Sequence, residues 1–185
     1  SIKYPIILIG SKMLVISQLK KLGKKLKFET LEKDKINNYN LKKKIYLIDI
    51  KYNFRKPFER ISNKSKNYIS KCFQTAFLLL NAKFGKILIN GPVSKQHFLH
   101  KNFPGITEYV FKNTKKKVSK NPVMLIYNKS LSVSPVTTHI PVKDISEKLN
   151  KTIIINNVLN INNFYKNKLK ILPKIAILGL NPHCE

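Results

Sequence analysis

The chain has few cysteines and no long apolar run, and each absence excludes a class of protein. Its 185 residues contain two cysteines, Cys72 and Cys184, which are too few and too far apart for a disulfide framework. We therefore expect free thiols in a reducing cytoplasm. No stretch approaches the roughly 18 consecutive apolar residues that a membrane span needs. The short apolar run near the N-terminus is not followed by a small-residue cleavage site, so we expect no signal peptide.

Acidic residues are also scarce. The chain has 9 Asp and Glu against 36 Lys and Arg, which gives a formal net charge of +27 and a pI near 10.1. Such a charge ordinarily suggests nucleic acid as a partner. Nucleic-acid-binding proteins concentrate charge on one face, however, and here the lysines are spread along the whole chain with an excess of Asn and Ile. Lys, Asn and Ile share codons rich in A and T, so we favour mutational bias over a basic nucleic-acid-binding domain, the rival interpretation. Under either interpretation, the positive charge of the chain would attract anionic, phosphorylated substrates.

What is present is an alternation of short apolar runs and amphipathic segments. The apolar runs predict strands at residues 6–10, 44–50, 86–90, 123–127, 131–136 and 174–178. Apolar residues at spacings of three and four predict helices at residues 13–22, 65–81, 95–99, 106–113 and 152–165. The segment between the first two strands, beyond its helix, has the pattern of a polar connection. This alternation predicts an α/β fold with a mixed, mostly parallel sheet and flanking helices, in which the strands around residue 129 form an antiparallel hairpin.

The helix at residues 65–81 has the clearest pattern. Ser62 or Ser65 is placed to cap its start. One apolar stripe runs along it, formed by Ile69, Cys72, Phe73, Ala76 and Leu80. Because Cys72 lies on that stripe, we expect it to pack in the core and not to act as a reactive thiol.

Ligand sites of parallel α/β sheets lie beyond the carboxyl ends of strands, so the residues that follow each predicted strand are the first candidates for a site. After residues 86–90 comes Gly91-Pro92-Val93-Ser94-Lys95. Gly91 permits a tight turn, Ser94 is placed to cap the next helix, and Lys95 adds a point charge, which together suit a bound phosphate. Strand–Gly–Ser turns are common, however, and a purely structural turn explains the same residues.

Two further strand exits carry a histidine. His139 stands in Thr137-Thr138-His139-Ile140-Pro141, and His183 stands in Gly179-Leu180-Asn181-Pro182-His183. A lone histidine is usually structural, but two at strand exits could converge on one metal ion, which needs about three protein ligands. His97 and His100, three residues apart on a short helix, are typical of a solvated face.

A Pro-Gly turn begins the predicted helix at residues 106–113. The segment reads Phe103-Pro104-Gly105-Ile106-Thr107-Glu108-Tyr109. Thr107, at the helix start, either caps the backbone or binds a ligand, and capping is the simpler interpretation.

These segments, in this order, resemble the 4-hydroxythreonine-4-phosphate dehydrogenase family of vitamin B6 biosynthesis. The four matching pieces are residues 91–95, 103–109, 136–141 and 179–183, and the resemblance covers roughly residues 65–185 well and the first part loosely. It implies a two-lobe architecture like that of isocitrate and isopropylmalate dehydrogenases, incomplete here. About residues 1–90 would then belong to the first lobe and about 91–185 mostly to the metal- and substrate-binding lobe. We expect the chain to be a fragment, inactive alone; a degenerate scaffold is the other possibility.

The resemblance also implies a reaction and its site. The family oxidises 4-phosphooxy-L-threonine with NAD (or NADP) and a divalent metal (Zn, Mg or Co), in a cytoplasmic homodimer whose subunits share the active site. It assigns His139 and His183 as metal ligands, with a third histidine supplied by the other subunit from beyond Glu185, and Thr107 as a substrate contact. Ile106 stands where the family usually has a histidine that contacts substrate, so a related dehydrogenase of a four-carbon phosphorylated sugar acid (threonate or erythronate 4-phosphate) is the alternative. Lys95 is our own candidate for the substrate phosphate.

Overall fold

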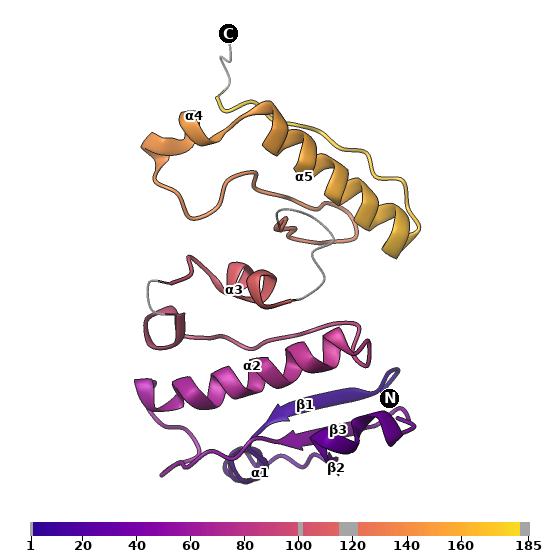
Figure 1. Cartoon of the computed structure of the whole chain (residues 1–185), viewed down its shortest axis with the longest axis vertical. Coiled ribbons are helices and arrows are strands. Elements are labelled where there is room, and N and C mark those ends of the chain that lie inside the picture. The colour runs from indigo at the N-terminus through magenta and orange to yellow at the C-terminus, as the bar shows by residue number, and fades with distance from the viewer. Residues whose placement is uncertain (1, 100–101, 115–121, 182–185) are drawn as a thin grey trace. The chain divides into compact units, whose positions relative to one another are not determined.

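The computed structural model describes residues 2–99, 102–114 and 122–181 (Figure 1). Contacts within the chain divide it into two compact units, Ser1–Lys116 and Lys117–Glu185. The first unit contains a parallel sheet with helices, which confirms the predicted α/β class. The two lobes expected to meet near residue 90 stay a prediction. The family resemblance defines those lobes by function, whereas the two compact units are defined by contacts within the chain. In the part of the chain that the structure describes, no helix is long and apolar enough to cross a membrane.

The sheet has three parallel strands in the order β1-β3-β2. The strands are β1 (Ile6–Gly10), β2 (Glu29–Leu31) and β3 (Ile45–Asp49). Tyr46, Leu47 and Ile48 of the central strand are buried, which is why its sequence is a continuous apolar run. The predicted strands at 6–10 and 44–50 are thereby confirmed. The polar connection predicted between them was wrong, because it contains β2 and the 3-10 helix η1 (Lys33–Asn38). β2 has a single buried residue, Leu31, so its strand comes from pairing with β3 and not from its own pattern.

The helix α1 (Lys12–Lys21) follows β1 directly. Ser11 caps it, since its Oγ accepts a hydrogen bond from the Leu14 N–H at 3.3 Å. The helix stops at Gly23, which has a φ of +63°, and the Lys24 N–H donates to the Leu19 carbonyl at 2.9 Å. That left-handed glycine and the bond behind it form the Schellman-type end that the position of Gly23 predicts.

The long helix α2 (Lys66–Asn81) packs on two sides. Leu79 belongs to the core beside the sheet, with buried partners Leu31, Ile36, Tyr46 and Ile48. Phe73 and Phe77 instead join a second cluster with Phe98 and Leu99. Figure 1 shows α2 above the sheet and α1 below it. The predicted helix at 65–81 is confirmed. Its expected side-chain cap is not formed, because the Ser65 Oγ donates to the Ser62 carbonyl at 3.1 Å instead.

Two shorter helical segments complete the first unit. They are the single π-helical turn η3 (Lys95–Leu99) and the helix α3 (Ile106–Asn113). Both pack on the second cluster through apolar residues, among them Phe98 from η3 and Ile106 from α3. The positions predicted for these two helices are confirmed.

Two predicted buried strands are not formed. Residues 86–90 form no strand, and Ile87 and Ile89 are 81% and 90% exposed. Residues 174–178 also form no strand, with Leu178 88% exposed. Both runs have the composition of a buried strand, but a strand forms only where a neighbour accepts and donates its backbone hydrogen bonds. Among the described residues neither run has such a neighbour.

The second unit is mainly helical. It contains η4 (Val142–Asp144), α4 (Ile145–Lys148), α5 (Lys151–Phe164) and the π-helical turn η5 (Tyr165–Leu169). The Asn150 side chain caps α5 by accepting from the Ile153 N–H at 3.0 Å, and the helix predicted at 152–165 is confirmed. Of the predicted hairpin, only one antiparallel bridge forms, between Ile126 and Val133. The direction of pairing was right, but no regular strand follows from it among residues 122–181.

Candidate functional site

The carboxyl end of β1 is joined to α2 through one tyrosine. The Tyr68 hydroxyl accepts a hydrogen bond from the Ser11 N–H at 2.9 Å. Asp49, at the end of β3, accepts from the Lys12 N–H through Oδ1 at 2.8 Å. The Tyr68 ring stacks on Tyr52, with ring centroids 4.7 Å apart. These contacts hold the strand ends, the start of α1 and the first half of α2 in one arrangement.

Burial changes the acidity of two groups at this junction. It raises the pKa of Tyr68 to about 12, although the Ser11 N–H acts in the opposite direction. It also raises the pKa of the Cys72 thiol to about 11, partly offset by the hydrogen bond to Tyr68. A neutral, half-buried thiol is a poor nucleophile, so the packing role predicted for Cys72 agrees with its surroundings. Cys184 lies outside the described residues.

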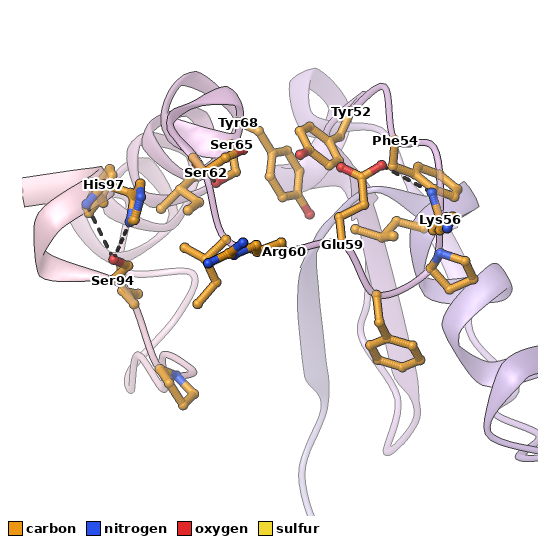
Figure 2. Close-up of a pocket in the computed structure, with 18 of the residues that line it drawn as sticks. Tyr52, Phe54, Lys56, Glu59, Arg60, Ser62, Ser65, Tyr68, Ser94 and His97 are labelled. Carbon is orange, nitrogen blue, oxygen red and sulfur yellow. Dashed lines mark hydrogen bonds between the residues drawn. The ribbon is translucent and has the colours of Figure 1, made fainter.

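A cavity of about 280 Å³ opens beside this junction. Its walls come from the loop that precedes α2, from the first turns of α2 and from the turn at Pro92–His97 (Figure 2). The polar and charged groups that line it are Gln18, Lys56, Glu59, Arg60, Ser62, Ser65, Ser94 and His97, and its aromatic residues are Tyr52, Phe54, Phe58, Tyr68 and Phe98. The mixture of cations, hydroxyls and rings suits a small anionic ligand with an apolar body.

One wall of the cavity is the turn predicted to bind phosphate. The Ser94 Oγ accepts from the His97 N–H at 3.3 Å and lies 2.9 Å from the His97 Nδ1 (Figure 2). Ser94 therefore performs the capping role expected of it. Lys95 is exposed and is not among the residues that line the cavity. His97 was expected on a solvated face, and this was wrong: it is half-buried, because the π-helical turn directs it back to Ser94. His100 lies outside the described residues.

The opposite wall carries a carboxylate that the backbone holds in place. Glu59 accepts hydrogen bonds from the N–H groups of Arg55 and Lys56 through one oxygen. These donors, that of Arg55 first, lower the pKa of Glu59, so its charge is stabilised by its own loop. Arg60 follows directly, and Figure 2 shows it between this loop and the Ser94–His97 pair in the view drawn.

The start of α3 presents the three residues Ile106, Thr107 and Glu108. Ile106 is partly buried and packs against the second cluster, so its apolar side chain has a structural role. Thr107 does not cap the helix, because the helix begins at Ile106 with Gly105 as its N-cap residue and has no side-chain cap. The capping interpretation was wrong, and the substrate contact stays a prediction. The Glu108 Oε2 is buried and has no hydrogen-bond partner among the described groups.

His139 lies in the second unit, in the segment that leads to η4. Its side chain is exposed, and its backbone has a φ of +57°, a left-handed conformation that few non-glycine residues adopt. An exposed imidazole suits a transition-metal ion. The described residues contain no group of three His, Cys, Asp or Glu side chains that could hold one, and His183 lies outside them. The described chain thus offers one ligand where about three are needed.

Comparison with known proteins decides the family. The family described as "Pyridoxal phosphate biosynthetic protein PdxA" matches residues 2–185 of the chain. The chain belongs to this family. The match extends over the first part of the sequence as well, where the resemblance by motifs was loose.

The curated relatives of this PdxA-family chain have one name in common. A protein of Sulfurihydrogenibium sp. is 34% identical over 97% of the chain, one of Wigglesworthia glossinidia brevipalpis 31% over 92%, and one of Aquifex aeolicus 27% over 98%. All three are named 4-hydroxythreonine-4-phosphate dehydrogenase. The matches cover 54%, 51% and 55% of these relatives, so the chain spans about half of their length.

Sequence reasoning missed three residues of this region. Tyr68 joins the end of β1 to α2, Arg60 lines the cavity, and Glu108 has a buried carboxylate oxygen with no hydrogen-bond partner in the described part of the chain. For Arg60 there was a usable signal. Arg55 and Arg60 are the only arginines of the chain, against 34 lysines, and both lie in this one loop. For Tyr68 and Glu108 the local patterns were those of ordinary helix residues.

Proposed function

We propose that this chain is part of an NAD-dependent, divalent-metal-dependent oxidoreductase that acts on 4-phosphooxy-L-threonine in vitamin B6 biosynthesis. The observation that carries the proposal is the PdxA-family match over residues 2–185, together with the shared name of the relatives. The two-lobe architecture, the homodimer with a shared active site and the cytoplasmic location belong to the same proposal. Because the chain spans about half of its relatives' length, the activity is proposed for the longer protein.

The reaction is a secondary-alcohol oxidation followed by loss of carbon dioxide. The carbon that bears the hydroxyl gives a hydride to NAD, and the hydroxyl proton is released, which leaves a β-keto acid. The bond to the carboxylate then breaks, its electrons pass toward the ketone, and 3-amino-2-oxopropyl phosphate remains after protonation. The enzyme's contribution to such a step is positioning and electrostatics.

Within this chain we assign the roles as follows. His139 and His183 are proposed as metal ligands, with the third from the partner subunit. A bound divalent ion would lower the pKa of the substrate hydroxyl and polarise the carbonyl that forms. Thr107 is proposed to hold the substrate, and Lys95, which is exposed, to attract its phosphate. The exposed imidazole of His139 supports its role, since a ligand must be reachable.

One observation favours a second substrate. Ile106, at the family's histidine position, packs in an apolar cluster and cannot donate or accept a hydrogen bond. The alternative is therefore a substrate that needs no hydrogen bond from that position, such as a four-carbon phosphorylated sugar acid. Threonate or erythronate 4-phosphate would be oxidised by the same chemistry.

The test uses a protein that spans the full length of the relatives and contains this sequence. NADH formation is followed with 4-phosphooxy-L-threonine and, separately, with each of the two sugar-acid phosphates. We expect turnover with the first compound, and that His139→Ala lowers kcat by about 100-fold or more, because the ion contributes several kcal/mol to the transition state.

The matched control is His97→Ala, which removes an imidazole from the other compact unit. Bound metal, measured by elemental analysis, should fall in His139→Ala and stay unchanged in His97→Ala. Full metal content and activity in His139→Ala would falsify the ligand assignment. Preference for a sugar-acid phosphate would establish the alternative substrate.

A further inference from the structure

We infer that the cavity lined by Arg60, Ser62, Ser94 and His97 binds the phosphate group of a small phosphomonoester. The site lies within the first compact unit, and none of the roles assigned to His139, Thr107 or Lys95 requires it. The inference goes beyond the proposed function, since a phosphate can bind here whether or not the dehydrogenase reaction is the right one.

One cation of this cavity, Arg60, is an arginine in a chain that mostly uses lysine. The chain uses lysine 34 times and arginine twice, and both arginines stand in the loop that forms this wall. A bias toward A- and T-rich codons explains the lysines, but it gives no reason for arginine to be restricted to one loop. Arginine differs from lysine in its planar fork of N–H donors, which matches two oxygens of a phosphate at once. A site that needs two parallel hydrogen bonds to an oxyanion explains the choice of Arg60.

Other polar side chains surround the same space. Ser62 and Ser65 line the cavity from the start of α2, and Ser94 and His97 line it from the opposite turn (Figure 2). The Ser62 side chain does not cap the helix that follows it. The Ser65 hydroxyl already donates to the Ser62 carbonyl, and Ser94 is paired with His97. The Ser62 hydroxyl and the second ring nitrogen of His97 are therefore the groups that can donate to phosphate oxygens not bound by the arginine. The two walls come from segments about thirty positions apart, so the tertiary structure brings them together.

The charge of the cavity also favours an anion. Besides His97, the side chains lining it that are charged near neutral pH are Lys56 and Arg60, both positive, and Glu59, negative, so 2 − 1 leaves one positive charge. The carboxylate of Glu59 is already engaged by two backbone N–H groups of its loop, and their effect lowers its pKa. Among the described residues, no ion pair joins Lys56 or Arg60 to a carboxylate. The charge of this cavity favours an anion.

The shape of the cavity decides between a bare ion and a larger molecule. About 280 Å³ exceeds what one phosphate ion fills, and Tyr52, Phe54 and Phe58 line part of the space. Aromatic walls stabilise a carbon body by removing it from water. We therefore assign a phosphate attached to a short carbon chain in preference to inorganic phosphate.

The experiment titrates the chain as it stands by calorimetry, at low ionic strength, in a buffer without phosphate. The ligands are inorganic phosphate, O-phospho-L-threonine and ADP. L-threonine, which has the same carbon skeleton without the phosphate, is the control. We expect O-phospho-L-threonine to bind more tightly than inorganic phosphate and L-threonine to give no signal. Tighter binding of ADP, or equal binding of the monoester and free phosphate, would overturn the assignment of a small phosphomonoester.

Three variants separate a built site from general attraction by a basic protein. Arg60→Gln should weaken O-phospho-L-threonine at least about tenfold, since a charge-assisted pair of hydrogen bonds is lost. Arg60→Lys keeps the charge without the fork and should still weaken binding several-fold. Lys71→Gln is the matched control: it removes one charge from a neighbouring cavity lined by Lys51, Lys64 and Lys71 and should change the Kd by less than about twofold.

Equal losses in Arg60→Gln and Lys71→Gln would show diffuse electrostatic attraction and would overturn the proposal. Full affinity in Arg60→Lys would show that the paired N–H donors of the guanidinium group do not bind the phosphate, which would contradict the argument for arginine. Arg60 and Lys71 are both exposed, so these variants should fold, and circular dichroism checks it. Because binding is measured directly, failure of this site and absence of dehydrogenase activity are separate results.

Discussion

At the scale of single residues, the contact that organises the first unit is the one between Tyr68 and the end of β1. The Tyr68 hydroxyl accepts a hydrogen bond from the Ser11 N–H, and the Tyr68 ring stacks on Tyr52. The hydroxyl oxygen of Tyr68 also occupies the space beside Gly10. A Cβ added at Gly10 would lie 2.9 Å from that oxygen, closer than real Cβ contacts allow. Glycine is therefore required at this strand end by close approach of a side chain and not by backbone conformation.

We predict that Gly10→Ala lowers the free energy of unfolding by about 1–3 kcal/mol, because Tyr68 must leave its hydrogen bond or its stack. Urea denaturation measures the change. Gly85→Ala is the control, since a Cβ there would make an ordinary contact with Leu80 at 3.7 Å. In a Tyr68→Phe background, which has no hydroxyl oxygen, the cost of Gly10→Ala should shrink. The same cost in both backgrounds would show that the two residues do not interact.

The Cys72 thiol gives a prediction of pH dependence. Burial raises its pKa from an ordinary value of 9.0 to about 11, so the folded state favours the neutral thiol. This contribution to the free energy of unfolding is complete below about pH 9 and is lost as the pH rises toward about 11. In a Cys184→Ser background, the rate at which the folded protein is alkylated should rise with pH with an apparent pKa near 11. For the protein unfolded in urea, the same measurement should give an apparent pKa near 9. A folded-state value near 9 would mean that the thiol is solvated.

At the scale of elements, identical apolar patterns led to different structures. The runs at 6–10 and 44–50 became paired strands, whereas those at 86–90 and 174–178 did not. Composition determines that a segment favours the extended backbone, but only a neighbour supplies the hydrogen bonds that make it a strand. The short β2 is the converse case, since its pairing with β3 compensates for a weak pattern. Local patterns therefore predicted the helices well and the strands only where partners exist.

The exposure of the run at 86–90 can be tested in this chain. Ile87 and Ile89 are 81% and 90% exposed, so the double change to Thr should alter the free energy of unfolding by no more than about 0.5 kcal/mol. Leu79→Ala, at a residue that is 7% exposed, should cost about 2–5 kcal/mol and is the positive control. Urea denaturation measures both. A cost for the double variant similar to that of Leu79→Ala would mean that the run is buried, as its sequence predicts.

At the scale of the whole molecule, charge dominates. The net charge is +27, and the ion pairs in the described part of the chain are Lys35–Glu32 at 2.8 Å and Lys44–Glu29 at 2.5 Å, both exposed. Exposed pairs contribute little to stability. Most positive charges thus repel one another without compensation, which destabilises the compact state.

We predict that salt stabilises this protein. Raising NaCl from about 0.05 M to about 0.5 M shortens the Debye length from roughly 14 Å to about 4 Å and screens the repulsion, so the Tm should rise by several degrees. Thermal unfolding followed by circular dichroism measures it. KCl at the same concentration is the control and should give the same rise, because screening depends on ionic strength and not on the identity of the monovalent cation. A Tm that falls with salt would show that attractive pairs outweigh the repulsion.

The sequence by itself determined the family, the α/β class, most helices and the two strands that pair with each other, because motif order and apolar periodicity are properties of short segments. It also placed Ser94 as a cap. It could not determine which apolar runs would find partners, that the loop of Arg60 faces the Ser94–His97 turn, or that Tyr68 closes over Gly10. Those facts depend on contacts between segments distant in the chain, and only the tertiary structure decided them.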